Sequence, residues 1–445
     1  MLRVLLFCLV FSLILSLRLI LYFNNLQKYH EGEKVKLTTT LLDEPKISEG
    51  KNGFPGSQTL NINNLRITLS RYPEYHYSDT IVLTGTITRN QYISRTGQLI
   101  DMGLVLKNPK VDLITNSNDK LWLPIKSFLS FIYIIRQKIN TTFNRYLAKD
   151  EAGLLMGIVF GIKSQMDKDY FSALKSAGVL HVIAASGMNV TMVGAFLESM
   201  LVVFFKRQVA LGITILGIIF YAVFSGLAPS IIRASIMCIF VYSAGMIGRQ
   251  SYSYVTLFIT AFIMLMLWPE LVNDIGFQLS FSSTLGILSI KPILTNIFKS
   301  KRLFIKLGTN DDFQTTFSAQ VVSLPIMLTS FSSYNPISIV TNTLVLWTIP
   351  PLMVFGLIAC IFAFIYEPVA VVLLYACLPL LLFFKTVVVF FASVFHNLNI
   401  SNIPVSLTVG YYFLLVSVIL YLSKKEQLID KKSIRQPADK NQRQD

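Results

Sequence analysis

Residues 208–247 read QVALGITILGIIFYAVFSGLAPSIIRASIMCIFVYSAGMI, and this stretch decides the fold class. It consists of two apolar runs, 208–225 and 229–247, and Arg233 is its single charged residue. Each run is long enough to cross about 30 Å of hydrocarbon as an α-helix. The stretch therefore predicts two transmembrane helices joined by a short break.

The composition of the whole chain extends this prediction. Of its 445 residues, 53% are hydrophobic and 14% are charged, which excludes a soluble globular protein. The formal net charge of +15 suits anionic partners, either lipid headgroups or nucleic acid, and does not choose between them. The four histidines are scattered without the H-x-H or H-E-x-x-H spacing of metal sites. The four cysteines all lie in apolar runs, so we expect no metal, no cofactor and no disulfide framework.

We expect a polytopic α-helical membrane protein with about ten transmembrane spans. The first lies in residues 2–23, which lack the small residues of a signal-peptide cleavage site and are interpreted as an uncleaved anchor. The other spans are expected near 178–205, 208–225, 229–247, 252–268, 276–291, 313–331, 337–365, 368–384 and 404–422. Residues 385–395, bracketed by Lys385 and His396, are expected to be interfacial.

Basic residues between the spans indicate their orientation, because cytoplasmic loops carry an excess of Lys and Arg. These markers are Lys206 with Arg207, Arg249, the cluster at 299–306 and the tail at 424–432. An even number of expected spans separates each basic marker from the next, so all the markers can lie on the cytoplasmic side. With Arg3 also inside, we expect residues 24–120 outside a cell (inner or plasma) membrane and the C-terminus in the cytoplasm.

Residues 24–120 have the composition of a small water-exposed domain, with 12 Lys and Arg against 10 Asp and Glu. Short alternating or β-branched runs between Gly, Asn, Pro and Asp residues are typical of strands. Such runs lie at 35–38, 65–69, 81–87 and 102–106, whereas 44–57 is expected to be a loop. About five strands in this length predict an extracytoplasmic β-barrel of the OB type.

The same domain contains interleaved aromatic and basic residues. They are Arg71, Tyr72, Tyr75, Tyr77, Arg89, Tyr92 and Arg95. Single-stranded nucleic acid is bound by such combinations, with bases stacked on rings and phosphates near cations. The alternative is ordinary packing of tyrosines in a sheet.

Residues 121–175 are expected to form amphipathic and short interfacial helices. Apolar residues recur at helical spacing over 123–147, and polar residues fill the other face. In the next segment Gly153, Gly157 and Gly161 are spaced by four, and such a stripe permits close approach between helices.

Polar residues interrupt the apolar spans at points that the expected orientation places on the outer side. Pro229 is suited to start a helix after the break at 225–228. The free amides of that helix start, together with Arg233, predict a phosphate site. The alternative is that Arg233 pairs with Asp274 or Glu198 inside the helix bundle.

Two further polar segments, 181–189 and 273–278, reach the same side in this interpretation. The three segments together predict one outward cavity built from distant parts of the sequence. For His181 alone, a hydrogen bond to nearby backbone is the competing interpretation.

Four segments, in order, resemble the ComEC family of competence proteins. They are HVIAASGMNV at 181–190, YAVFSGLAPSIIRA at 221–234, DIGFQLSF at 274–281 and SAQVVSLP at 318–325, followed by Asn342. The similarity extends over about residues 30–422, and the outer domain resembles the OB-like domain of that family. The resemblance implies a channel that passes one strand of DNA into the cytoplasm. It also implies a separate ATP-driven motor in the cytoplasm, a DNA receptor outside and a nuclease.

The pore-lining candidates come from these segments, and we expect no catalytic residue among them. They are His181, Ser186, Asn189, Ser225, Pro229, Ser230, Arg233, Asp274, Gln278, Gln320 and Asn342. Where this chain has Asn189, the family commonly has a second histidine. Larger members end in a metallo-β-lactamase-like domain, and its H-x-H-x-D-H ligands are missing here, so we expect a channel without its own nuclease.

Two other functions compete with the DNA channel. A permease for a small anionic solute would also use broken helices, although no second copy of SGMN or PSIIR indicates an internal repeat. A membrane-embedded nuclease would have to rely on Asp274, Glu198 and His181, whose spacing matches no ligand pattern. The expected domains are an anchor at 1–23, the outer barrel at 24–120, helices at 121–175, the multi-span domain at 176–423 and a basic tail at 424–445.

Overall fold

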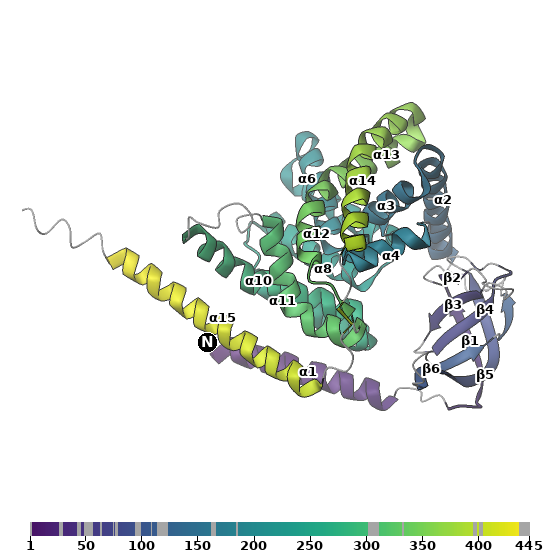
Figure 1. Ribbon diagram of the computed structural model, residues 1–445, viewed down its shortest axis with the longest axis horizontal. Coiled ribbons are helices and arrows are strands. Elements are labelled where there is room, and N and C mark those ends of the chain that lie inside the picture. The colour runs from purple at the N-terminus through teal and green to yellow at the C-terminus, as the bar shows by residue number, and fades with distance from the viewer. Residues whose placement is uncertain are drawn as a thin grey trace, which may run out of the picture. The chain divides into compact units, whose positions relative to one another are not determined.

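The computed structural model divides the chain into two compact units, one of strands and one of helices (Figure 1). The residues it describes are 2–25, 30–41, 46–48, 57–62, 65–73, 75, 79–93, 99–107, 109–113, 123–161, 166–183, 186–300, 311–331, 333–394, 398–399 and 404–435. The sheet unit is Leu19–Thr141, and the helical unit is Met1–Arg18 with Thr142–Asp445.

Seven strands form the sheet unit. They are β1 (Lys34–Thr40), β2 (Lys46–Ser48), β3 (Ser57–Ile62), β4 (Leu65–Ser70), β5 (Thr80–Ile93), β6 (Leu99–Lys107) and β7 (Lys110–Leu113). Their order is β1-β5-β6-β4-β3-β2, with β7 paired to β5, and only the β4–β6 pair is parallel among these strands. All four strand segments predicted from the sequence are present. The expected loop at 44–57 is wrong in part, because β2 pairs with β3 there.

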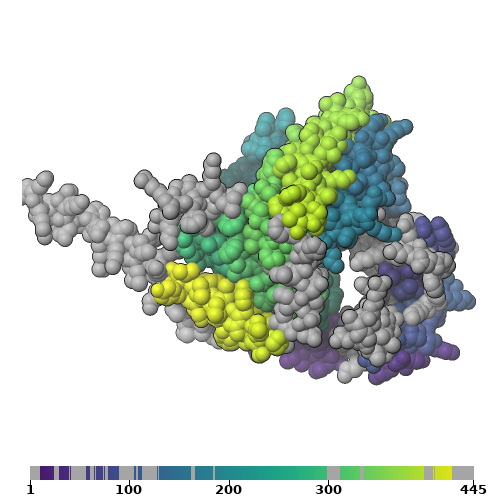
Figure 2. Space-filling model, viewed as in Figure 1, coloured from purple at the N-terminus to yellow at the C-terminus, as the bar shows by residue number. Residues whose placement is uncertain are grey.

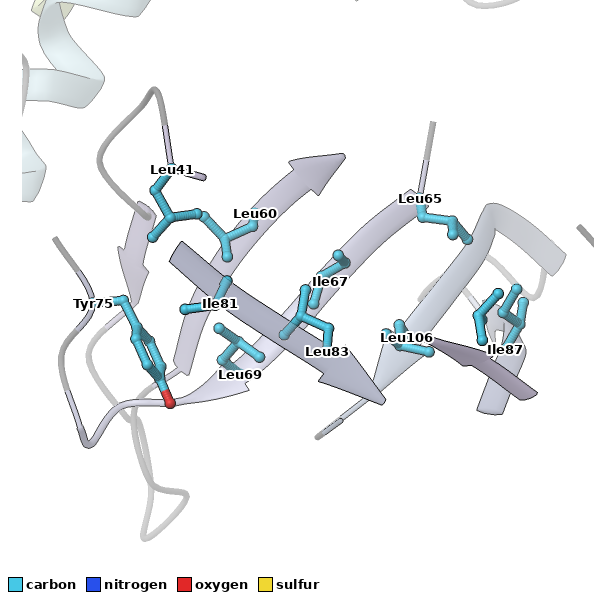
Figure 3. Packing of buried hydrophobic residues seen from close by; sticks show 11 residues of the cluster. Leu41, Leu60, Leu65, Ile67, Leu69, Tyr75, Ile81, Leu83, Ile87 and Leu106 are labelled. Carbon is cyan, nitrogen blue, oxygen red and sulfur yellow. The ribbon is translucent and has the colours of Figure 1, made fainter. Parts of the chain in front are cut away.

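Alternate residues of the strands form the core of this unit (Figure 3). In β4, Leu65, Ile67 and Leu69 are buried, and Ile81 and Leu83 follow the same period in β5. The path of paired strands ends at β1 and β2, and no pairing joins these two strands in the described part of the chain. A small sheet is therefore present in this part of the chain, while closure into an OB-type barrel stays a prediction.

The helical unit contains most of the chain. Its elements, with the helices α1 and α2 that connect the two units, are α1 (Leu2–Asn25), α2 (Leu123–Tyr146), α3 (Lys149–Phe160), α4 (Lys168–Ser176), α5 (Leu180–Ile183), α6 (Gly187–Phe204), α7 (Arg207–Phe224), α8 (Pro229–Ile247), α9 (Ser253–Leu267), η1 (Pro269–Asn273), α10 (Ile275–Ser300), α11 (Asp311–Phe331), β8 (Ser333–Tyr334), α12 (Ser338–Val345), η2 (Leu346–Thr348), α13 (Ile349–Ile365), α14 (Glu367–Val394), β9 (Leu398–Asn399) and α15 (Val405–Arg435).

Five helical stretches of the described chain are long and apolar enough to cross a membrane. They are Gly187–Phe204, Arg207–Phe224, Pro229–Ile247, Ser338–Ile365 and Glu367–Val394. Shorter apolar helices lie at Phe11–Asn24, Ser253–Leu267 and Ser406–Leu422. The chain is therefore a mostly helical membrane protein, and the count of ten spans stays a prediction.

The structure differs from the expected spans at two places. The stretch expected at 178–205 is divided, because α5 ends at Ile183 and α6 begins at Gly187. Helix α14 also runs without a break from Glu367 to Val394, past the end of the span expected at 384, while the interfacial position of 385–395 stays a prediction. The ammonium of Lys385 lies 2.8 Å from Asp150 Oδ2 and 3.0 Å from Glu151 Oε1, so its charge has partners within the protein.

Helix α3 lies inside the helical unit, although the sequence indicates a short interfacial segment there. Every residue from Glu151 to Phe160 is buried. Gly157 contacts Ile183 of α5 so closely that an added Cβ would overlap the isoleucine side chain, and Gly356 of α13 allows similar contact with Val159. Figure 2 shows the yellow-green α14 adjoining the blue region that contains α3 and α4, which it contacts.

Candidate functional site

Arg233 is a buried cation in the second turn of α8. Its side chain is 8% exposed, and its Nε donates a hydrogen bond to Ser280 Oγ of α10 at 2.7 Å. The guanidinium lies 5.8 Å from the ring centroid of Phe281, and its Nη1 is 3.4 Å from Met237 Sδ. In the described part of the chain, no carboxylate forms an ion pair with it. The expected alternative, pairing with Asp274 or Glu198, is therefore wrong for the described residues.

The first turn of α6 lies against this guanidinium. A Cβ added at Gly187 would be 2.6 Å from Arg233 Nη2. Only glycine leaves room for that approach, and the start of a helix has amides without partners inside the helix. The start of α6 at Gly187 thus lies against a buried arginine.

Asn189 has a partner in α3. Its Nδ2 donates to Ile158 O at 2.7 Å, and its Oδ1 accepts a hydrogen bond from Ser186 Oγ at 3.0 Å. Tyr221 Oη of α7 donates to the next carbonyl, Val159 O, at 2.8 Å. Carbonyls of the last turn of a helix have no donor within the helix. Asn189 and Tyr221 therefore complete the end of α3.

Asp274 and Gln278 serve the corner between η1 and α10. Asp274 Oδ1 accepts the backbone N–H of Phe277 at 2.6 Å, which is a cap of the first turn of α10. Gln278 Nε2 donates to Val272 O at 2.8 Å. Their polar groups are thus engaged close to their own positions in the sequence.

Gln320 and Asn342 belong to a group of buried polar residues on α11 and α12. Gln320 Nε2 donates to Ser338 Oγ at 3.0 Å. Ser338 in turn packs against Gly178, whose φ of 74° lies in the left-handed region. Asn342 is 1% exposed, and neither its amide nitrogen nor its amide oxygen has a hydrogen-bond partner among the described residues.

These contacts meet at residues 178–189. Arg233 reaches Gly187, α3 reaches Asn189, and α12 reaches Gly178. Of the three segments predicted to form one cavity, the structure brings 181–189 and the start of α8 together, whereas Asp274 and Gln278 of 273–278 bond within their own corner. The shared cavity stays a prediction, and Ser338 of α12, which Gln320 of α11 contacts, packs against Gly178 in addition. His181 lies within the turn at 178–189 and is exposed.

The remaining candidates near this turn are at the end of α7 and the start of α8. Ser225 Oγ is buried and has no hydrogen-bond partner in the part of the chain that the structure describes, and Pro229 opens α8 as predicted. Ser230 follows in the first turn of α8 and is partly buried.

In the sheet unit, some of the residues predicted to contact nucleic acid are exposed and others are buried. Tyr72 is 68% exposed and the Arg71 guanidinium lies 5.4 Å from its ring centroid. Tyr75 is 6% exposed and belongs to the core, so it is not available for base stacking. Burial, followed by the negative charge of Asp79, raises the pKa of the Tyr75 hydroxyl. Arg89 is exposed on β5, which also carries Tyr92, whereas Tyr77 and Arg95 lie outside the described residues.

The residues that hold these candidate residues in place were not predicted from the sequence. Buried Gln58 donates from Nε2 to Ser70 O, Arg71 O and Pro73 O, at 2.7 to 3.0 Å, and so fixes the turn that carries Tyr72. Ser280 stands in the quoted motif DIGFQLSF, but only the helix register shows that it reaches Arg233. Tyr221 likewise opens a quoted motif and has no polar neighbour in the sequence to indicate its role.

The described residues contain no group of three or more His, Cys, Asp or Glu side chains that would hold a metal ion.

Comparison with known proteins identifies relatives of the helical unit. The model of the competence protein family matches residues 158–425. ComE operon protein 3 of Bacillus subtilis (strain 168) is 28% identical over 228 residues, which are 49% of this chain and 27% of that protein. An uncharacterized protein of Aquifex aeolicus (strain VF5) is 26% identical over 225 residues, 49% of this chain and 51% of that protein. The chain thus covers between about a quarter and a half of these relatives, and no solved structure matches it.

Proposed function

The chain belongs to the competence protein family, and on that premise we propose that it conducts a single strand of DNA through the cell membrane. The family indicates a role in DNA uptake for competence, and the apolar helices are those of a membrane protein. Conduction, the outward position of the sheet unit and the cytoplasmic C-terminus belong to the proposal. It also assigns driving force, DNA capture and strand degradation to a separate motor, receptor and nuclease.

Arg233 is the observation that supports this proposal. A charged side chain within a transmembrane helix costs about 2.5 to 3.5 kcal/mol on insertion scales and is retained for a function. This one has a hydroxyl, a thioether and an aromatic ring as neighbours, and no carboxylate among the described residues neutralises it. A guanidinium offers several donors in a fork that fits a phosphate, and the start of α6 adds a favourable dipole.

The phosphate would have to displace the present cover of Arg233. Ser280 and Phe281 of α10 contact the guanidinium and leave it 8% exposed. The structure is therefore that of a closed state in this proposal, and the strand passes when α10 withdraws.

The test separates DNA capture from DNA entry. Arg233→Gln should leave DNA bound at the cell surface unchanged and reduce DNA reaching the cytoplasm about 10- to 100-fold, since charged hydrogen bonds contribute about 1.5 to 3 kcal/mol each. Arg233→Lys should keep part of the activity. The control is Arg249→Gln, because Arg249 is exposed beyond the end of α8. Normal entry by an Arg233→Gln protein present at the usual amount in the membrane would refute the phosphate role.

A permease for a small anionic solute is the second candidate, supported by the interrupted helices α5–α6 and α12–α13. It predicts that Arg233→Gln lowers uptake of labelled inorganic phosphate or a carboxylate in vesicles that hold this protein, with DNA entry unaffected.

A further inference from the structure

Helices α10 and α11 pack along each other, and each contains an internal proline. Proline has no backbone N–H, so the carbonyl four residues earlier loses its donor within the helix. For Pro292 of α10 this carbonyl is Leu288 O. For Pro325 of α11 it is Val321 O.

Both carbonyls are bound by a tyrosine from another helix. Tyr254 Oη of α9 donates to Leu288 O at 2.9 Å. Tyr411 Oη of α15 donates to Val321 O at 2.7 Å. Tyr412, next to Tyr411, donates to Val322 O at 3.1 Å. In both helices of the hairpin, a tyrosine hydroxyl therefore donates the hydrogen bond that the proline nitrogen cannot donate.

A carbonyl held from outside its helix differs mechanically from one held within it. A hydrogen bond inside a helix moves with the helix, whereas these two tie the hairpin to α9 and to α15. Prolines are also the points at which helices bend. Each of the two helices thus has a bend point, and at each bend point a tyrosine hydroxyl of α9 or α15 bonds to the carbonyl that the proline leaves without a donor.

The hairpin covers the guanidinium of Arg233. Ser280 and Phe281 lie on α10, ahead of Pro292 in the chain. The two helices pack closely, since Gly286 lies so near the carbonyl of Ser318 that an added Cβ would overlap it.

We propose that Tyr254 and Tyr411 are latches that hold a hinged α10–α11 hairpin over Arg233. When the hydroxyls release the carbonyls, the hairpin bends at Pro292 and Pro325 and uncovers the guanidinium. The identity of the ligand that then reaches Arg233 rests on the proposed function. The hinge and the latches do not, because they are inferred from the two prolines and the hydrogen bonds beside them.

The first test is a double-mutant cycle between each latch and its proline. Tyr411→Phe should lower the melting temperature of the purified protein in detergent by about 2 °C, the shift that corresponds to one hydrogen bond. In a Pro325→Ala background, residue 325 has its own N–H for Val321 O, so Tyr411→Phe should then have no effect. Tyr254→Phe with Pro292→Ala forms the second cycle.

Exposed tyrosines give the matched controls. Tyr421 of α15 is 68% exposed and Tyr252 beside α9 is 72% exposed. Tyr421→Phe and Tyr252→Phe should leave the melting temperature unchanged in every background. Equal shifts from Tyr411→Phe with and without Pro325 would overturn the latch.

The second test measures the opening. Ile236 of α8 packs in the cluster that contains Phe277 and Phe281 of α10. In an Ile236→Cys protein, the combined Tyr254→Phe and Tyr411→Phe changes should raise the rate of maleimide labelling at residue 236 at least fivefold. Cys377 of α14 is fully buried and should label at the same slow rate with or without the latches.

The labelling result separates this inference from the proposed function. An unchanged rate at residue 236, or a parallel rise at Cys377 that indicates general unfolding, would refute the hinge. Faster labelling at residue 236 alone supports it, even if Arg233→Gln leaves DNA entry intact and the phosphate role fails.

Discussion

Asn189 shows how a residue in a family motif can act on the structure rather than on a ligand. It is 1% exposed, and its amide is held between Ser186 and the carbonyl of Ile158. The sequence suggested a pore residue at this position because it is polar and lies in an apolar span. Its partner is 31 residues earlier in the chain, and nothing in the local sequence indicates that pair.

Asn189→Ala should therefore destabilise the helical unit. The change leaves Ile158 O buried without a donor, which costs about 1 to 3 kcal/mol. We expect a melting temperature several degrees lower, measured with the purified protein in detergent. Thr191→Ala is the control, because Thr191 is exposed and bonds only to its own helix at Met188 O. If both variants melt at the wild-type temperature, Asn189 does not hold α3.

Lys385, Asp150 and buried Glu151 form a partly buried ionic group, which connects α14 to the start of α3. Burial raises the pKa of the Asp150 carboxyl, but the hydrogen bond from Lys385, the backbone N–H of Asp167 and the charges of Lys385 and Lys149 outweigh burial. The pKa of Asp150 therefore lies below its ordinary value of 3.8 in the folded protein.

This sign determines the pH dependence. A carboxyl whose pKa is lower in the folded state stabilises the fold above its unfolded pKa, and that contribution is lost as the pH falls through the folded pKa. Asp150→Asn should cost about 2 kcal/mol at pH 7. The difference from wild type should disappear as the pH is lowered from 4 toward 2. Melting temperatures over this range test it, with the exposed Asp169→Asn as control; a difference that does not depend on pH would contradict it.

At the scale of elements, hydropathy predicted where helices lie more reliably than where they break. Apolar length identified α7, α8 and α13, because a membrane span requires about 20 apolar residues. The division of the expected 178–205 span into α5 and α6 falls within the polar segment 181–189, although hydropathy gave one continuous span there. The continuity of α14 through Lys385 was not predicted, since it depends on Asp150 and Glu151 from a distant helix.

Gly286→Ala should separate α10 from α11. The added methyl group meets the backbone carbonyl of Ser318 and the side chain of Val322. A backbone atom cannot move aside cheaply, so we expect a loss of more than about 2 kcal/mol, in the range of overpacked cores. Gly410→Ala is the matched control, because nothing lies within 4 Å of the added atom in α15. It should be neutral or slightly stabilising, since alanine favours helix more than glycine does.

These two variants are compared by thermal unfolding in detergent. Equal stability of the Gly286→Ala and Gly410→Ala proteins would show that the two helices have room to adjust. It would also remove the close contact that makes α10 and α11 move as one hairpin.

At the scale of the molecule, composition indicated where the strands lie, because the polar stretch 24–120 contains all seven strands of the sheet unit. The sheet unit itself runs from Leu19 to Thr141, so it also includes the end of α1 and most of α2, which composition did not indicate. Strand segments were recognised because alternation is a local signal. The order β1-β5-β6-β4-β3-β2 was not, because pairing between strands far apart in the sequence leaves no local trace.

The orientation in the membrane is the prediction that connects the two units. Helices α7 and α8 lie between Lys206 and Arg249, and α9 and α10 lie between Arg249 and the basic cluster at 299–306. If each of these helices spans the bilayer, all the basic segments are on one side, which the preference of Lys and Arg for the cytoplasm makes the inner side. The sheet unit, after one span by α1, is then outside.

Single cysteines test this orientation in a variant whose four native cysteines are replaced. A cysteine at Tyr72, which is 68% exposed in the sheet unit, should react with a membrane-impermeant maleimide in intact cells. Cysteines at Gln208 and Gln250, both exposed beside basic residues, should react only after the cells are opened. Reaction of Gln208→Cys in intact cells would place the first basic marker outside. It would reverse the direction in which the 178–189 turn faces, and with it the side from which a DNA strand could reach Arg233.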